Sequence, residues 1–132
     1  DQYDFAILKF SVKNFRLRKI GIYEGLRLLD EVYFIQPFVL TENNNVELYL
    51  LSAKIASGEF DNELKVATYY KLDRASWPGS SGSGVFVIRD NLVYLVGYIT
   101  DLETYQTENY VATFAIFRPI LPELREVLKS LK

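Results

Sequence analysis

The sequence predicts a mainly β, antiparallel domain that ends in a single α-helix. Short runs rich in β-branched and aromatic residues, separated by turns containing Gly, Asn or Asp, recur up to residue 116. The period then changes, because leucines recur with helical spacing at positions 121, 124, 128 and 131. With 132 residues, of which 49% are hydrophobic and 24% charged, the chain has the composition of a soluble globular protein with one core.

The first half of the chain contains four predicted strands. Residues 4–10 form a run whose two faces are both largely apolar, and residues 15–23 form a second, alternating run. Strands over 29–38 and 46–56 follow. A polar turn with consecutive asparagines at 43–45 joins them, because Asn tolerates left-handed backbone and bonds its own main chain.

The second half continues with a strand over 63–72 and a loop rich in Gly and Ser. Residues 84–88 and 91–100 are predicted to form a hairpin. Residues 101–109 are polar and predict a loop, and 110–116 predict the last strand.

The C-terminal helix is expected to begin near Pro119 or Pro122. Proline is favoured in the first helical turn, and Glu123 near the start and Lys129 near the end complement the helix dipole.

Composition excludes several classes of function. The chain has no Cys and no His, which removes disulfides, thiolate chemistry, the commonest metal ligand and the commonest general base, so no metal or cofactor is predicted. Net charge is −2 and the basic cluster at 16–19 fits a solvated strand face, so nucleic-acid binding is not supported. No apolar run approaches the roughly 20 residues of a membrane span and no targeting signal is recognised, which leaves the compartment open.

The loop that follows residue 72 carries the candidate chemistry. Gly79, Gly82 and Gly84 permit positive φ and close approach of main chain, and Pro78 restricts the backbone before them. The N–H groups around Ser81 can therefore converge on one point, which is how an oxyanion hole is built. The alternative is an ordinary Gly- and Ser-rich turn between two strands.

The residues of this loop resemble the nucleophile loop of the chymotrypsin/trypsin-like serine proteases, most of all the cysteine-free bacterial and viral kind. The family pattern Asp-x-x-x-x-Pro-Gly-Asn/Asp-Ser-Gly-Gly/Ser reads here as Asp73, four residues, then Pro-Gly-Ser-Ser-Gly-Ser at 78–83. Further similarity lies in segments 4–9, 29–38, 95–100 and 110–116. The resemblance covers essentially the whole chain but only the later portion of a family domain.

This resemblance implies a fold and its divisions. Residues 25–117 would form the second antiparallel β-barrel of a trypsin-like protease. Residues 1–24 would be remnant strands of the first barrel with a linker, and 118–132 the C-terminal helix. All three would belong to one structural unit.

The resemblance also implies site residues. Ser81 would be the nucleophile, Asp4 would orient the base, and the N–H groups of Gly79 and Ser81 would form the oxyanion hole. The pocket for the substrate residue before the scissile bond would be formed by five residues, namely Ala75, Gly97, Tyr98, Ile99 and Thr100. Read from the sequence alone, the preferred interpretation of Asp4 is an exposed acid near a chain end.

The missing histidine leaves two functions open. One is a serine endopeptidase acting on polypeptides, whose His comes from a segment upstream of this chain, so that the chain alone is inactive. The other is a non-catalytic protease-like binding or structural module, such as a viral component or a pseudoprotease. Lys54 or Lys71 could replace the base only if deeply desolvated. The incomplete first unit predicts a partner, either the missing segment or another copy of the chain.

Overall fold

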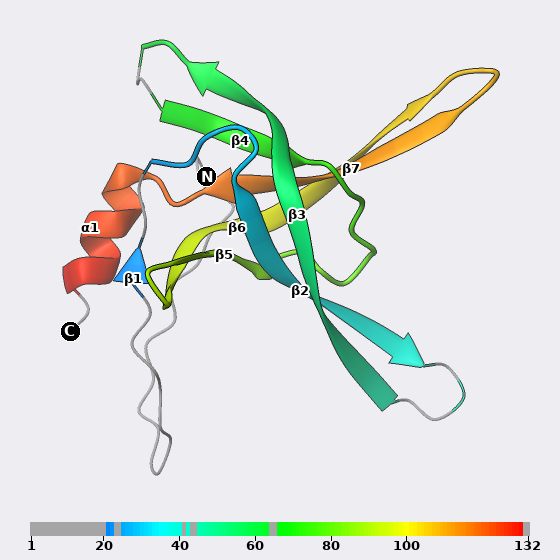
Figure 1. Ribbon diagram of the computed structural model, residues 1–132, viewed down its shortest axis with the longest axis horizontal. Helices are drawn as coiled ribbons and strands as arrows, with labels where there is room; N and C mark the ends of the chain where they lie inside the picture. Colours follow the sequence, from blue (N-terminus) through cyan, green and yellow to red (C-terminus); the bar gives the residue numbers. More distant parts are fainter. Residues whose placement is uncertain (1–20, 23–24, 41, 43–44, 64–65, 131–132) are drawn as a thin grey trace.

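The computed structural model describes residues 21–22, 25–40, 42, 45–63 and 66–130. Within these residues the chain is mainly β, with one short helix at its C-terminal end, as the sequence predicts (Figure 1). The elements are, in order, β1 (Gly21–Ile22), β2 (Glu31–Leu40), β3 (Asn45–Asp61), β4 (Val66–Leu72), β5 (Gly84–Arg89), β6 (Leu92–Gln106), β7 (Val111–Pro119) and α1 (Pro122–Ser130).

The strands from β2 to β7 form one antiparallel sheet that closes on itself. Its neighbours run in the order β6, β5, β2, β3, β4 and β7, and β7 pairs back with β6. The result is a ring of six strands, which confirms the six antiparallel strands expected between about residues 29 and 116. β1 pairs with β6 in parallel and lies outside the ring.

Alternation along the strands places the core inside this ring. On β2, Val32, Phe34 and Gln36 are fully buried, while Glu31 before them and Ile35 between the last two are exposed. The same period brings inward a set of buried apolar side chains from the other ring strands: Ala53, Ile55, Ala67, Tyr70, Leu72, Val85, Val87, Val96, Ile99, Ala115 and Phe117. The ring is therefore a packed core rather than a channel.

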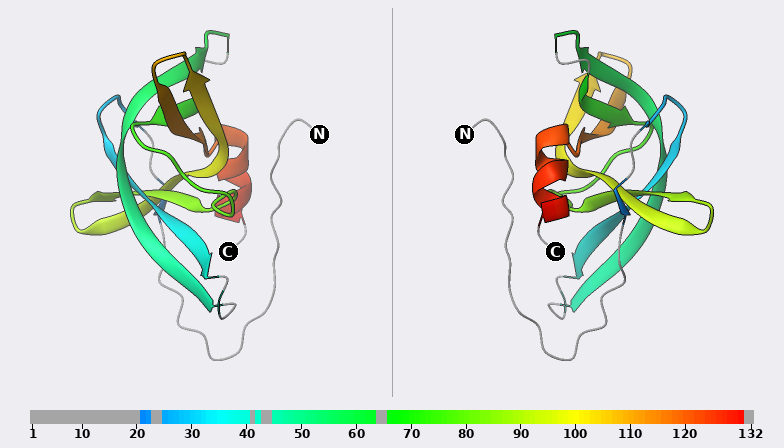
Figure 2. Two further views of the ribbon diagram at one scale, coloured as in Figure 1. Left: turned by 90° about the vertical axis from the view of Figure 1, so that its right-hand side faces the viewer. Right: turned by 90° about the vertical axis from the view of Figure 1, so that its left-hand side faces the viewer.

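Register shifts bend the strands so that the sheet can close. They occur in the β3–β4 pair at Ile55/Ser57 and Glu59/Phe60, in the β5–β6 pair at Val85/Phe86, and in the β6–β7 pair at Ile99/Asp101. An extra residue on one strand increases local twist and coiling. β3 pairs first with β2 and then with β4, and its long ribbon bends between the two (Figure 2).

One sequence prediction is wrong. Residues 101–109 were expected to form a loop, but β6 continues to Gln106 and pairs with β7 as an arm that leaves the ring (Figure 1). The turn is confined to the tip, where the Thr107 N–H donates to the Tyr110 carbonyl at 2.9 Å. Polar residues are tolerated here because most of the arm is exposed, and main-chain pairing rather than apolar alternation makes the strand.

The remaining fold predictions concern the C-terminal helix and the first unit of the chain. α1 begins at Pro122, one of the two predicted starts, with Glu123 in its first turn and Lys129 in its last. Of the predicted first unit, only β1 lies within the described residues, and the strand predicted over 4–10 lies outside them. In the part of the chain that the structure describes, no helix has the length and apolarity to cross a bilayer.

Candidate functional site

The serine loop connects β4 to β5, two strands that are not neighbours in the ring. β3 and β2 lie between them, so the loop must cross one end of the closed sheet. Hydrogen bonds attach the loop to β3, one of the strands that it crosses. Asp73 Oδ1 accepts the Lys54 N–H of β3 at 2.8 Å, and Arg74 Nη1 donates to the Ser52 carbonyl at 3.0 Å.

The centre of the loop is held by hydrogen bonds that converge on Ser80. This side chain is 2% exposed, and its Oγ donates to the Trp77 carbonyl at 2.9 Å. The Ser80 N–H donates to the same carbonyl at 3.3 Å, and the Ser80 carbonyl accepts the Ser83 N–H at 2.9 Å. Ser80, rather than the serine after it, is therefore the structural serine of the turn.

Two glycines in this turn adopt conformations that other residues avoid. The φ angles are +98° at Gly79 and +82° at Gly82, as the sequence pattern predicts for a loop that curls its main chain. Gly84 has no positive φ; a Cβ there would lie 2.7 Å from the Phe86 ring, which would have to shift. The two positive φ angles flank Ser81 and present it at the surface, where its side chain is exposed.

The N–H groups of the turn divide into two sets. Those of Ser80 and Ser83 donate within the loop, and that of Gly82 donates to the Ile99 carbonyl of β6 at 2.8 Å. Among the described residues no acceptor engages the N–H of Gly79 or of Ser81, and none pairs with the Ser81 hydroxyl. Within residues 79–83 of the loop, the two donors predicted for an oxyanion hole are thus the two N–H groups without an acceptor among the described residues; earlier in the loop, the N–H groups of Arg74, Ala75 and Ser76 also have none.

A cavity of about 230 Å³ lies beside Ser81. Its wall is made by loop residues and by the part of β6 just before the arm: Ser76, Trp77, Pro78, Ser80, Ser81, Ile99, Thr100, Asp101 and Leu102. Of the predicted pocket residues, Ile99 and Thr100 line it, whereas Ala75, Gly97 and Tyr98 are not among its lining residues. Thr100 Oγ1 is buried and has no hydrogen-bond partner among the described residues.

Gly97 contributes to this region through the close packing of β6 against β7. A Cβ at this position would lie 2.2 Å from the Arg118 carbonyl oxygen and 2.7 Å from the Phe117 ring. The absent side chain lets β6 approach β7 where their pairing begins, opposite Pro119. Gly97 therefore sets the path of the strand that carries Ile99 and Thr100, rather than forming a wall itself.

Neither lysine considered as a replacement base has the environment that such a base needs. Lys71 forms an ion pair with Glu103 and donates to the Tyr105 hydroxyl at 2.6 Å. The hydrogen bond to Glu103 and then that to Tyr105 raise the pKa of Lys71 above its ordinary value, so the ammonium keeps its proton. Lys54 is exposed, which is the opposite of desolvated.

The two remaining members of the predicted triad are not found among the described residues. Asp4 falls outside the described residues, and the sequence has no His to stand beside Ser81. Across the ranges that the structure describes, no three acidic, His or Cys side chains gather in a way that could hold a metal ion.

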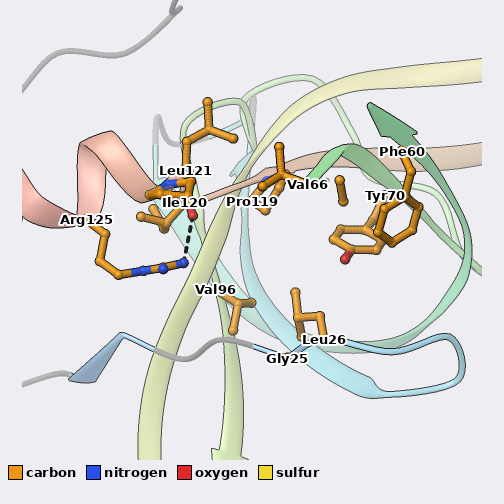
Figure 3. A pocket seen from close by; sticks show the side chains of 12 residues that line it. Gly25, Leu26, Phe60, Val66, Tyr70, Val96, Pro119, Ile120, Leu121 and Arg125 are labelled. Carbon is orange, nitrogen blue, oxygen red and sulfur yellow. Dashed lines mark hydrogen bonds between the residues drawn. The ribbon is translucent and has the colours of Figure 1, made fainter. Parts of the chain in front are cut away.

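A second cavity, of about 330 Å³, lies between the ring and α1 (Figure 3). Leu26, Tyr70, Val96 and Leu121 contribute apolar surface, and Arg125 lies at its helix side, where Nη2 donates to the Ile120 carbonyl at 3.2 Å. It contains none of the predicted site residues.

Sequence reasoning missed two residues that shape the loop. Gln36 on β2 is fully buried and bonded to the main chain of Trp77, and Trp77 itself lines the cavity beside Ser81. The available signal was a single polar residue, Gln36, within the otherwise apolar run 32–40.

Comparison with protein-family models and with curated proteins yields no relative. No protein-family model matches the chain, and no curated protein sequence matches it either.

Proposed function

We propose that Ser81 is the nucleophile of a trypsin-like serine endopeptidase whose histidine base is supplied by polypeptide outside these 132 residues. The observation that carries the proposal is the construction of the loop. Ser81 is exposed between two glycines of positive φ, and the N–H groups of Gly79 and Ser81 have no acceptor among the described residues.

The chemistry follows from these groups. The Ser81 Oγ would attack the scissile carbonyl carbon while an imidazole nitrogen takes its proton, and the carbonyl oxygen would become an anion. The N–H groups of Gly79 and Ser81 would donate hydrogen bonds to that oxyanion, and one such donor typically stabilises the transition state by about 2.7–4 kcal/mol. The imidazole would then pass the proton to the leaving amine, and water would release the acyl group from Ser81. Asp4 remains the candidate to orient the imidazole.

The cavity beside Ser81 suggests the substrate. Ile99, Leu102 and Trp77 supply apolar surface, and the volume of about 230 Å³ suits one side chain. A small or medium apolar residue before the scissile bond is therefore the preferred occupant, since a cationic one would need a partner. Asp101 also lines the cavity, so dominant cleavage after Lys or Arg would assign that role to Asp101 instead.

The test compares two lengths of the protein. The 132-residue chain should show no more than residual labelling by a fluorophosphonate and residual peptide hydrolysis. A version extended upstream of Asp1 to include a histidine should gain both activities. Ser81→Ala in that version should remove them, whereas Ser57→Ala, which changes an exposed serine of β3, should not. Hydrolysis that survives Ser81→Ala would overturn the proposal.

The competing function is a non-catalytic protease-like module that binds another protein. The observation that favours it is the absence of His from the whole sequence. It becomes the better account if the upstream-extended protein also lacks labelling at Ser81.

A further inference from the structure

We propose that Gln36 is a positioning residue for the Ser81 loop, acting through the main chain of Trp77. Gln36 is a polar side chain with 0% exposure on a strand whose other inward residues, Val32 and Phe34, are apolar. A buried amide is costly unless both of its polar atoms are bonded. Its presence in the ring therefore calls for an explanation in terms of what it binds.

Both ends of the Gln36 amide bond main-chain groups. Oε1 accepts the Trp77 N–H at 2.8 Å, across 41 residues of sequence, and Nε2 donates to the Pro37 carbonyl at 2.9 Å. The identity of the two neighbours determines the orientation of the amide, because an N–H must face the oxygen and a carbonyl must face the nitrogen. The side chain thus joins β2 to the loop in one defined arrangement.

Further hydrogen bonds connect Trp77 to the residue that precedes Ser81. While the Trp77 N–H is held by Gln36, the Trp77 carbonyl accepts both the N–H and the Oγ of Ser80. Ser80 directly precedes Ser81 and bonds Ser83 in turn. A chain of hydrogen bonds therefore leads from β2 to the peptide that contains the Ser81 N–H.

The neighbouring residue of β2 holds the other side of the turn. Ser83 Oγ donates to the Ile35 carbonyl at 2.7 Å. Adjacent residues of one strand thus restrain the loop before and after Ser81. Since the N–H groups of Gly79 and Ser81 lie between these two points, their direction depends on both bonds.

This inference rests on the proposed function only for its catalytic consequence; the restraint on the loop can be measured without it. Trp77 is the only tryptophan in the chain, so its emission reports on this loop alone. In Gln36→Leu, which keeps the volume but removes the acceptor, hydrogen exchange of the Trp77 amide should be about tenfold faster than in the wild type. The emission of Trp77 should shift as well. Val32→Ala, a buried change on the same strand, is the matched control and should leave the Trp77 amide and emission unchanged in the folded state.

Gln36→Glu separates positioning from mere packing. A neutral carboxyl can still accept from Trp77 and donate to the Pro37 carbonyl, so at low pH the Trp77 signals should match the wild type. Ionisation removes the donor and buries an unpaired charge, so emission should change with pH in this variant and much less in the wild type. This titration also decides the matter if Gln36→Leu does not fold.

The outcomes discriminate between the two proposals. Two results together support positioning of a reactive serine. The Trp77 amide exchanges faster in folded Gln36→Leu, and fluorophosphonate labels a histidine-bearing form of this variant up to about a hundredfold more slowly than the wild type. Altered Trp77 signals in a protein whose Ser81 never reacts, even with a histidine supplied, would uphold the positioning by Gln36 and overturn the proposed function. Wild-type exchange at Trp77 in folded Gln36→Leu, or no pH-dependent change in Gln36→Glu beyond that of the wild type, would overturn the inference.

Discussion

Substitution of Gly97 by alanine tests how closely β6 and β7 must approach beside the candidate pocket. The added Cβ would lie 2.2 Å from the Arg118 carbonyl oxygen, 3.0 Å from the Arg118 carbonyl carbon and 2.7 Å from Cδ2 of Phe117. Two of these three atoms are main chain and cannot rotate away. Gly97 pairs with Pro119, so β6 would have to separate from β7 by roughly 1 Å, or the ring would have to change register there.

The expected cost follows from this geometry. Overpacking of a core typically destabilises by about 1–3 kcal/mol, and a clash with main chain belongs at or above the upper end, so we expect Gly97→Ala to lower the free energy of unfolding by about 3 kcal/mol. Urea unfolding followed by Trp77 emission measures this value. The matched control is Gly82→Ala, where φ is +82° and no atom lies within 4 Å of the added Cβ.

Gly82→Ala should lower the free energy of unfolding by only about 1–2 kcal/mol, which is the cost of left-handed backbone for an alanine. A loss below about 1 kcal/mol in Gly97→Ala, with an unchanged denaturant slope, would refute the reasoning, because it would mean that the sheet accommodates the methyl group. A loss no larger than that of Gly82→Ala would also count against the clash, because Gly97 has no positive φ and close packing is the only cost expected there.

Three further predictions concern the loop, the arm and the hairpin. Ser81→Ala should change the free energy of unfolding by less than about 0.5 kcal/mol, because the side chain is exposed and unpartnered among the described residues; a larger loss in thermal unfolding would make Ser81 structural. The hydrogen bond from Lys71, followed by that from Tyr105, lowers the pKa of Glu103, so Glu103 contributes stability that is present above the unfolded-state pKa of a glutamate and is lost as pH falls through the lower, folded-state value. Glu103→Gln should therefore lose less stability than the wild type between neutral and acidic pH, and parallel pH profiles would contradict this. Asn91→Val should destabilise by about 1–2 kcal/mol because Asn91 has a φ of +61° in the turn between β5 and β6; equal melting temperatures would contradict it.

Much of the fold could be predicted because it depends on neighbouring residues. Asp90 and Asn91, with φ of +51° and +61°, form the tight turn expected between the strands of the hairpin. Pro122 begins the helix where the leucine spacing predicts it. The positive φ angles at Gly79 and Gly82 follow from the same local pattern. In each case the preference of a few adjacent residues decides the conformation.

The arm was missed because its stability comes from pairing between distant residues. Glu103 is opposite Phe114 and Thr104 is opposite Thr113, so polar residues alternate poorly with apolar ones on a ribbon that has little core beneath it. Periodicity detects burial, so a strand held mainly by main-chain hydrogen bonds looks like a loop in the sequence.

The sequence by itself determined the strands of the ring, the C-terminal helix, the hairpin turn and the loop that exposes Ser81, since all of these depend on local backbone preference and apolar period. Only the tertiary structure decided the closure of β7 on β6, the ion pair of Lys71 with Glu103, the cavity beside Ser81 and the bond from Gln36 to Trp77. The physical reason is separation along the chain: Gln36 and Trp77 are 41 residues apart, and their contact depends on how the ring brings β2 under the loop. A hydrogen bond of that kind leaves no local pattern, so the side chain that holds the candidate site looked from the sequence like one polar residue in a strand.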